Sequence, residues 1–309
     1  MKEKIFVAAV VGPTASGKTK LGVNLAKKFR GEVISADSMQ IYKELNISTS
    51  KPTKIETEGI PHHLMDIRSV CEEYSASDFK SDAEKLITKI VARGKMPIFV
   101  GGTGLYLDAL FQNFDFNKRQ TEEIPEVRSM TNEKLHEELT KIDEISSKKI
   151  HVNDRRRLIR ACEFFETFGF PISRQKKIPR SQNCEYNVCK IGLNFKNRAI
   201  LYEKIGERVD KMLEQGLVDE VAAVSNMNPG KTAVNAIGYK EILEFIRGEL
   251  NLKEAAEKLK KATRNYAKRQ LTWFRRDEDI NWFYVDEYEN FEDLTKDAGE
   301  YAWKRLGEN

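Results

Sequence analysis

Short apolar runs alternate with amphipathic stretches along the N-terminal third of the chain. The apolar runs are rich in β-branched residues and cover residues 5–11, 33–36 and 97–100, whereas residues 18–29 and 76–92 show helical periodicity. Strands that alternate with helices are typical of a parallel sheet that is covered by helices on both faces. We therefore expect an α/β fold.

The C-terminal part continues this pattern with longer helices. Residues 187–195 and 282–286 are further candidate strands. Residues 198–224 and 252–274 have the periodicity of long helices. These elements extend the predicted sheet and its helical cover.

The middle of the chain differs in character from both ends. It has little strand signal and much charge, and residues 132–139 and 155–168 are its predicted helices. The pattern predicts a core formed by residues 1–113 and 186–309. A helical insertion at residues 114–185 interrupts this core.

The composition is that of a soluble globular protein, with 40% hydrophobic residues, 32% charged residues and a net charge of +4. Four cysteines without a C-x-x-C pair predict neither a disulfide framework nor a zinc site. The N-terminal apolar run is short and leads directly into a glycine-rich loop. No segment approaches the roughly 20 apolar residues of a membrane span. We expect a cytoplasmic protein with no membrane partner.

The glycine-rich loop after the first strand fits the phosphate-binding pattern G-x-x-x-x-G-K-[ST] at every constrained position. It stands between a strand and an amphipathic helix, as the pattern requires. Loop N–H groups and the helix N-terminus surround phosphate oxygens, Lys18 neutralises charge, and Thr19 is a ligand for Mg²⁺. The predicted phosphate-binding residues are Gly12, Pro13, Thr14, Ala15, Ser16, Gly17, Lys18 and Thr19. The core is therefore expected to be a P-loop NTPase-like parallel sheet.

A second glycine-rich loop follows the strand at 97–100 and contains Gly102, Thr103 and Gly104. It fails as a dinucleotide fingerprint because Leu107 stands where the third glycine belongs. At the carboxyl edge of a parallel sheet, this loop lies near the first one. Two interpretations stay open: a turn that needs positive φ, and a ligand contact through Thr103.

The second strand runs into Asp37, which places a carboxylate at the same edge of the sheet. Three roles fit it there: a metal ligand, a general base, or a cap of the following turn. Motor-type ATPases usually show a later apolar strand that ends in Asp-Glu, and this sequence has none. We prefer the general base.

Basic residues cluster in three places. The third segment, residues 258–276, contains no acid, and its spacing predicts a helix with one apolar face and one basic face that begins at the capping pair Asn251 and Glu254. The apolar stripe is Leu252, Leu259, Tyr266 and Trp273, and the basic stripe is Lys261, Arg264, Lys268 and Arg275. The insertion holds Lys148, Lys149, Arg155, Arg156, Arg157 and Arg160, then Arg174, Lys176, Lys177 and Arg180. A single cluster is usually a solvated face, but three of them in a chain of +4 favour a nucleic-acid partner.

Several longer motifs, in this order along the chain, resemble the tRNA dimethylallyltransferase family. They lie between Phe6 and about Trp282 and include SADSMQIYK, VGGTGLYLDAL, NDRRRLIRACE and RNYAKRQLTWFR. The resemblance implies transfer of a dimethylallyl group from dimethylallyl diphosphate to N6 of the adenosine beside the anticodon of tRNA. The phosphate loop then holds the diphosphate with Mg²⁺, and ATP is expected to compete rather than react. No protein partner is implied, and we expect a monomer.

The resemblance also assigns roles to residues. Asp37 is the expected base, Lys18 and Arg208 meet the leaving diphosphate, and Thr103 lies at the reaction channel. Many relatives have Gln where Arg156 stands, so a phosphate contact is favoured there over a base contact. With the basic helix included, the expected tRNA contacts are Asp37, Ser38, Met39, Gln40, Thr103, Arg128, Arg156, Arg157, Leu158, Ile159, Arg160, Lys261, Arg264 and Lys268.

Three alternatives remain. An adenylate isopentenyltransferase performs the same chemistry on a free nucleotide, but it needs neither basic surface. A P-loop small-molecule kinase is permitted by the first loop alone. A non-catalytic RNA-binding protein leaves Asp37 without a purpose.

Overall fold

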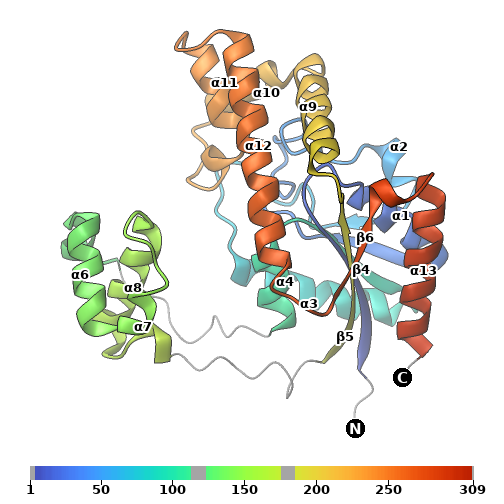
Figure 1. Ribbon diagram of the computed structural model, residues 1–309, viewed down its shortest axis with the longest axis horizontal. Helices are drawn as coiled ribbons and strands as arrows, with labels where there is room; N and C mark the ends of the chain where they lie inside the picture. The colour runs from blue at the N-terminus through green and yellow to red at the C-terminus, as the bar shows by residue number, and fades with distance from the viewer. Residues whose placement is uncertain (1–3, 113–122, 175–184, 308–309) are drawn as a thin grey trace. The chain divides into compact units, whose positions relative to one another are not determined.

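The computed structural model describes residues 4–112, 123–174 and 185–307. The chain divides into two compact units, Met1–Gln112 with Cys184–Asn309, and Asn113–Asn183. The first unit is built on a sheet and the second on helices (Figure 1).

The sheet of the first unit has six strands, all parallel, in the order β3-β2-β4-β1-β5-β6. β1 lies between β4 and β5, so that Ala8 is opposite both Ile98 and Cys189. The strands are β1 (Ile5–Val11), β2 (Gly31–Ser35), β3 (His62–His63), β4 (Met96–Gly101), β5 (Tyr186–Asn194) and β6 (Ile280–Tyr284). The predicted parallel α/β sheet is confirmed. The two-residue strand β3 carries too little pattern to be predicted.

Helices cover both faces of the sheet (Figure 1). Successive residues of β1 face opposite sides of the sheet, and both sides are buried. Ala8 and Val10 face a core with α1 (Lys18–Lys28) and α13 (Phe291–Gly307). The alternate residues Val7, Ala9 and Val11 face the larger core, which includes α3 (Ala76–Ala92) and α4 (Gly104–Phe111). The sheet is thus buried on both sides, and its carboxyl edge carries the loops that form the site.

The remaining helices of this unit are α2 (Lys54–Thr57), α9 (Arg198–Glu214), α10 (Leu217–Ser225), α11 (Tyr239–Ile246) and α12 (Leu252–Phe274). The predicted single helix at 198–224 is wrong, because Gly216 at φ +95° ends α9 and begins α10. α12 has the predicted bounds, and Asn251 caps it with Glu254 in a capping box.

The apolar stripe predicted for α12 is also wrong in part. Leu252 is 42% exposed, and Tyr266 and Trp273 are only partly buried. The buried face is Ala255, Leu259, Thr263, Ala267, Gln270 and Phe274. A seven-residue spacing drifts around a straight helix. The buried residues are separated instead by steps of four, four, four, three and four residues, which keep to one face.

The second unit contains α5 (Pro125–Ser129), α6 (Asn132–Ile142), α7 (Glu144–Ser147) and α8 (Arg155–Phe168). Its core is formed by Val127, Leu135, Leu139, Leu158, Ala161 and Cys162. None of the helices within the described ranges of the chain combines the length and apolarity that crossing a bilayer requires.

Candidate active site

The phosphate loop connects β1 to α1, and its two glycines are required by the geometry. Gly12 has φ +141°, and a Cβ there would lie 2.2 Å from the Leu193 carbonyl oxygen. Gly17 has φ +87° and is the N-cap of α1. The loop therefore ends at the start of a helix, where free N–H groups attract anions.

This loop contains a buried hydroxyl without a partner and a buried cation. Ser16 is 2% exposed, and its Oγ has no hydrogen-bond partner in the described part of the chain. Lys18 donates from Nζ to the Pro13 carbonyl at 2.6 Å. Burial and the nearby Arg208 charge lower the pKa of Lys18 to about 7, although Asp37 acts in the opposite direction. An anion in front of the loop would accept a hydrogen bond from Ser16 and stabilise the charge of Lys18.

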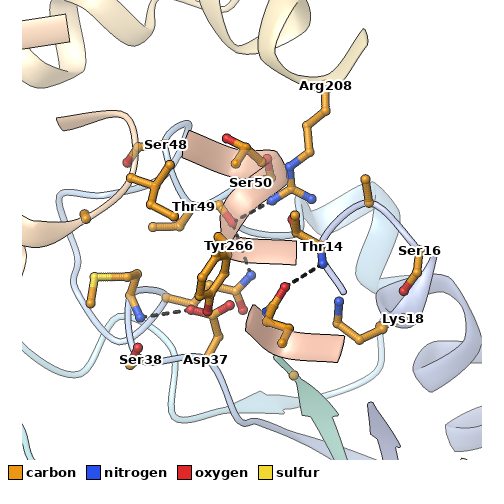
Figure 2. Close-up of a pocket in the computed structure, with 18 of the residues that line it drawn as sticks. Thr14, Ser16, Lys18, Asp37, Ser38, Ser48, Thr49, Ser50, Arg208 and Tyr266 are labelled. Carbon is orange, nitrogen blue, oxygen red and sulfur yellow. Dashed lines mark hydrogen bonds between the residues drawn. The ribbon is translucent and has the colours of Figure 1, made fainter. Parts of the chain in front are cut away.

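Arg208 projects from α9 toward the same place (Figure 2). Its guanidinium donates to the Thr49 carbonyl at 3.3 Å, and its buried Nε has no partner among the described residues. Burial lowers the pKa of Arg208, and the charge of Asp37 raises it. Lys18 and Arg208 thus face one cavity of about 300 Å³ from two elements far apart in the sequence.

Asp37 follows β2 and lies on the wall of this cavity (Figure 2). Its Oδ1 accepts a hydrogen bond from the Met39 N–H at 2.9 Å. The turn cap that the sequence left open is therefore formed. Oδ2 has no hydrogen bond among the described residues, so one carboxylate oxygen remains available for a proton. Ser38, Met39 and Gln40 line the cavity beside it, as a single segment.

Thr103 serves the site indirectly. Its Oγ1 accepts from the Ser38 N–H at 3.0 Å, and its own N–H donates to the Ala36 carbonyl at 3.0 Å. Thr103 does not line the cavity. It fixes the end of β2 to the loop after β4, which places the segment that contains Asp37.

The glycines of that second loop are explained by close approach rather than by positive φ, so the first of the two open interpretations does not apply. A Cβ on Gly102 would lie 1.9 Å from Gln270 Nε2, and one on Gly104 would lie 2.2 Å from the Trp273 ring. α12 packs directly on the loop backbone.

Gln270 is the residue of the site that sequence reasoning missed. It is 5% exposed, its Oε1 accepts from the Thr14 N–H at 2.9 Å, and its Nε2 donates to the Gly102 carbonyl at 3.1 Å. One side chain therefore fixes the two glycine-rich loops relative to each other. The motif RNYAKRQLTWFR contains Gln270, but nothing in its spacing indicates this contact.

Tyr266 and an apolar wall complete the cavity. The pKa of Tyr266 is raised, first by burial and then by the Asp37 charge, so its hydroxyl keeps its proton. The apolar lining consists of Met39, Met212, Ala236, Ile237 and Leu259. Cations, a carboxylate and an apolar wall thus line the same cavity, which suits a ligand with an anionic and an apolar end.

The residues predicted to contact tRNA outside the cavity fall in different environments. Lys261 and Lys268 on α12 are exposed and Arg264 is half-buried. In the second unit Arg156, Arg157 and Arg160 are exposed. Lys176, Lys177 and Arg180 lie outside the described residues.

Three residues of the second unit that were predicted to contact tRNA are buried or already paired with other side chains. Leu158 is 0% exposed in the core, so a tRNA contact through its side chain is wrong. Ile159 is half-buried against the same core. Arg128 is bound by the buried Glu163 at 2.7 Å and by Glu123 at 2.6 Å, so an RNA phosphate would have to compete with two carboxylates.

Comparisons with known proteins show what the whole chain is similar to. Residues 40–277 match the family model described as IPP transferase. A tRNA dimethylallyltransferase of Thermoanaerobacter sp. (strain X514) is 47% identical and covers 98% of this chain, which covers 99% of that protein. The solved tRNA isopentenylpyrophosphate transferase of Bacillus halodurans is 40% identical with a TM-score of 0.75, over 99% of this chain and 98% of that one. A eukaryotic dimethylallyltransferase that acts on tRNA is 31% identical with a TM-score of 0.76, over 91% of this chain and 74% of that one.

Proposed function

This chain belongs to the IPP transferase family, and on that premise we propose that it is a prenyltransferase that modifies tRNA. It transfers the dimethylallyl group of dimethylallyl diphosphate to N6 of the adenosine adjacent to the anticodon. The observation that carries the proposal is the single cavity into which the phosphate loop, Arg208 and Asp37 all face, with an apolar wall beside them.

The diphosphate end of the donor fits the cationic side of the cavity. The phosphate-loop N–H groups, Lys18 and Arg208 supply positive charge, and Ser16 Oγ supplies an unused hydroxyl. As the bond between the prenyl carbon and the diphosphate oxygen breaks, negative charge collects on the diphosphate. Fixed donors stabilise that charge more than they stabilise the bound donor, so they accelerate the step.

The adenine end requires a proton acceptor. N6 forms the new bond to the prenyl carbon and must lose one proton, and Asp37 Oδ2 is the acceptor that we propose. The segment from Asp37 to Gln40 receives the adenine, which must leave its stack to reach the cavity. Products are the prenylated adenosine and diphosphate, with the proton on Asp37 released afterwards to solvent.

Magnesium fits this arrangement through Thr19. The described residues contain no group of three or more His, Cys, Asp and Glu side chains placed to hold a metal. Mg²⁺ commonly binds through one protein oxygen, water and substrate phosphates, and the Thr19 side chain beside the cavity offers such an oxygen. When bound, the ion neutralises charge on the diphosphate.

We propose that the anticodon arm of tRNA binds to basic residues that are exposed or half-buried at the surface. The phosphate contacts that we propose are made by Lys261, Arg264 and Lys268 on α12 and by Arg156, Arg157 and Arg160 in the second unit. Arg157 also forms an ion pair with Asp154 at 3.3 Å. These surfaces argue for tRNA rather than a free nucleotide as the acceptor. The cytoplasmic location and the monomeric state stay predictions.

Labelled dimethylallyl diphosphate, offered with bulk tRNA, with AMP or with ATP alone, tests the proposal. We expect label in tRNA, one diphosphate released for each prenyl group, and no ATP cleavage. Label in AMP but not in tRNA would favour the adenylate isopentenyltransferase. Cleavage of ATP coupled to a phosphorylated product would favour a kinase.

A further inference from the structure

Glu220, on the first turn of α10, holds a loop that forms one wall of the active-site cavity. Its Oε2 accepts from the N–H groups of Asn46 and Ile47 at 2.8 and 2.7 Å. Its Oε1 accepts from the N–H and the Oγ of Ser48 at 2.9 and 2.7 Å. Three successive backbone N–H groups therefore converge on one carboxylate, an arrangement that binds anions strongly.

The loop held in this way carries the carbonyl that orients Arg208. Ser48, Thr49 and Ser50 line the cavity. The Thr49 carbonyl accepts from the Arg208 guanidinium at 3.3 Å. This is the hydrogen bond that the structure gives to Arg208, whose Nε is buried without a partner in the described part of the chain.

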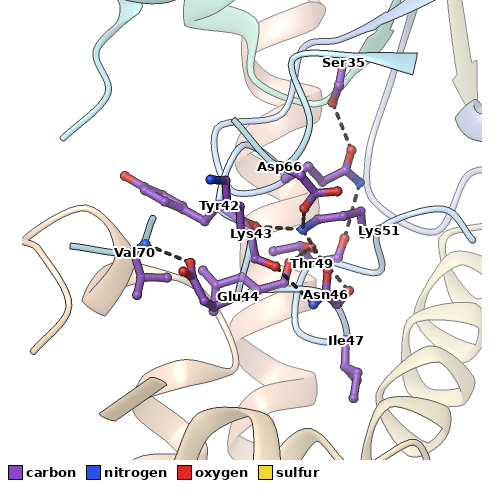
Figure 3. A network of polar contacts seen from close by, with 12 residues as sticks. Ser35, Tyr42, Lys43, Glu44, Asn46, Ile47, Thr49, Lys51, Asp66 and Val70 are labelled. Atoms are coloured by element: carbon purple, nitrogen blue, oxygen red, sulfur yellow. Dashed lines mark hydrogen bonds and ion pairs between the residues drawn. The ribbon is translucent and has the colours of Figure 1, made fainter. Parts of the chain in front are cut away.

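Lys51 anchors the other end of the same loop (Figure 3). The Lys51 side chain is 5% exposed and donates to the Tyr42 carbonyl at 2.7 Å and to Asn46 Oδ1 at 2.9 Å. Lys51 thus fixes its own end of the loop and the Asn46 side chain. The backbone N–H groups of residues 46–48 are held instead by Glu220 of α10.

We propose that Glu220 is a positioning residue of this active site, which acts by fixing residues 46–49 so that the Thr49 carbonyl aims Arg208 at the diphosphate. The inference rests on the proposed function. α9 supplies Arg208 and α10 supplies Glu220. Because the chain changes direction at Gly216, these two consecutive helices both form hydrogen bonds to the same loop. Without the hydrogen bonds of Glu220, the Arg208 guanidinium is present but displaced from the diphosphate. A displacement of about 1 Å costs on the order of 100-fold in rate.

Glu220→Gln is the informative substitution. The amide keeps the shape of the side chain but replaces one acceptor oxygen with an NH₂ donor, so it faces at least one N–H group that it cannot bind. We expect the single-turnover rate of prenyl transfer to fall on the order of 10–100-fold, with little change in tRNA affinity. Affinity for inorganic diphosphate, measured by calorimetry, should fall as well.

Asp219→Asn is the matched control. Asp219 lies on the same first turn of α10, so this substitution removes the same charge from the same helix end. The side-chain bonds from α10 to residues 46–48 come from Glu220, so they are kept. We expect wild-type rate and wild-type diphosphate affinity in this variant. An equal loss of rate in both variants would mean that helix stability, rather than loop position, is responsible, and would overturn the inference.

A double-mutant cycle with Arg208→Gln provides the decisive result. If Glu220 acts through Arg208, the double variant should match Arg208→Gln alone to within about threefold, whereas independent sites give multiplied losses of rate. Multiplied losses would overturn the inference. Glu220→Asp, which keeps the charge on a shorter side chain, should show a smaller loss with the same non-additivity, and it replaces Glu220→Gln if the amide variant does not fold.

The two readouts keep this inference separate from the proposed function. A wild-type protein that binds diphosphate without prenylating tRNA would refute the proposed function. In that case the diphosphate affinities of the Glu220 and Asp219 variants still decide whether Glu220 positions the site.

Discussion

The affinity of the site for diphosphate should depend on pH through Lys18. Its pKa in the free protein is about 7, because burial and Arg208 outweigh the favourable charge of Asp37. Bound diphosphate favours the charged amine and returns this pKa toward its ordinary value. Binding above pH 7 therefore requires the uptake of a proton, and the affinity must fall as the pH rises.

The size of the effect follows from the pKa. With the amine fully charged in the complex, the affinity scales with the charged fraction of Lys18 in the free protein. That fraction falls from about one half at pH 7 to about 1% at pH 9, so the affinity falls about 50-fold, or about 2 kcal/mol. Calorimetry of diphosphate binding in buffers of different ionisation enthalpy measures both the affinity and the proton uptake.

Lys18→Arg is the control, because a guanidinium stays charged throughout this range. The ionisation of the ligand contributes equally to both proteins, so the ratio of their affinities isolates Lys18. We expect the wild-type affinity to fall relative to the variant as the pH rises. Parallel pH profiles for the two proteins, with no extra proton uptake in the wild type, would refute this explanation of the Lys18 environment.

Other predictions concern stability, nucleotide competition and the basic helix. Glu32 is 3% exposed, and although burial raises its pKa, hydrogen bonds from Lys95, His63 and Arg93 lower it to about 2, so Glu32→Gln should cost about 3 kcal/mol at pH 7. This contribution is complete above pH 4.5 and is lost as the pH falls toward 2, so urea unfolding should show little difference between the two proteins at pH 2. ATP should raise the KM for dimethylallyl diphosphate without being cleaved, and cleavage coupled to product would contradict the assignment of the loop. Alanine at Lys261, Arg264 and Lys268 should flatten the log–log salt dependence of tRNA affinity by about 1 for each phosphate-binding charge removed, and an unchanged slope with normal folding would remove this surface from the tRNA site.

Local signals made much of the core predictable. β1 and α12 have the predicted bounds, because an uninterrupted apolar run defines the strand and the Asn251 capping box defines the start of the helix. α13 also carries a signal that the sequence analysis did not use, since Leu294, Ala298 and Ala302 repeat at four-residue spacing and form its buried side. The phosphate loop and Asp37 are predictable because the motif and the strand end locate them directly.

Contacts between distant segments were not predictable in this way. Gln270 meets Thr14 across 256 residues of sequence, and Glu220 meets Ser48 across 172. Neither contact produces a periodic pattern in the sequence, because each depends on how α12 or α10 packs against the rest of the unit. Gly216 interrupts a helical pattern without a polarity change, which is why the pattern of α9 and α10 predicts one helix. Leu158 stands among basic neighbours in the sequence, although helical geometry turns it inward.

The central claim is that Asp37 accepts the N6 proton in the cavity where the diphosphate departs. The measurement that tests it most directly is the single-turnover rate of prenyl transfer to tRNA by Asp37→Asn, with both substrates saturating. Asparagine keeps the size of the side chain and an oxygen for the Met39 N–H, but it cannot take a proton. We predict a fall in this rate on the order of 10²–10⁴-fold, with both substrates still bound. A variant that loses some stability yet transfers the prenyl group at the wild-type rate would show that Asp37 only caps its turn, and would contradict the claim.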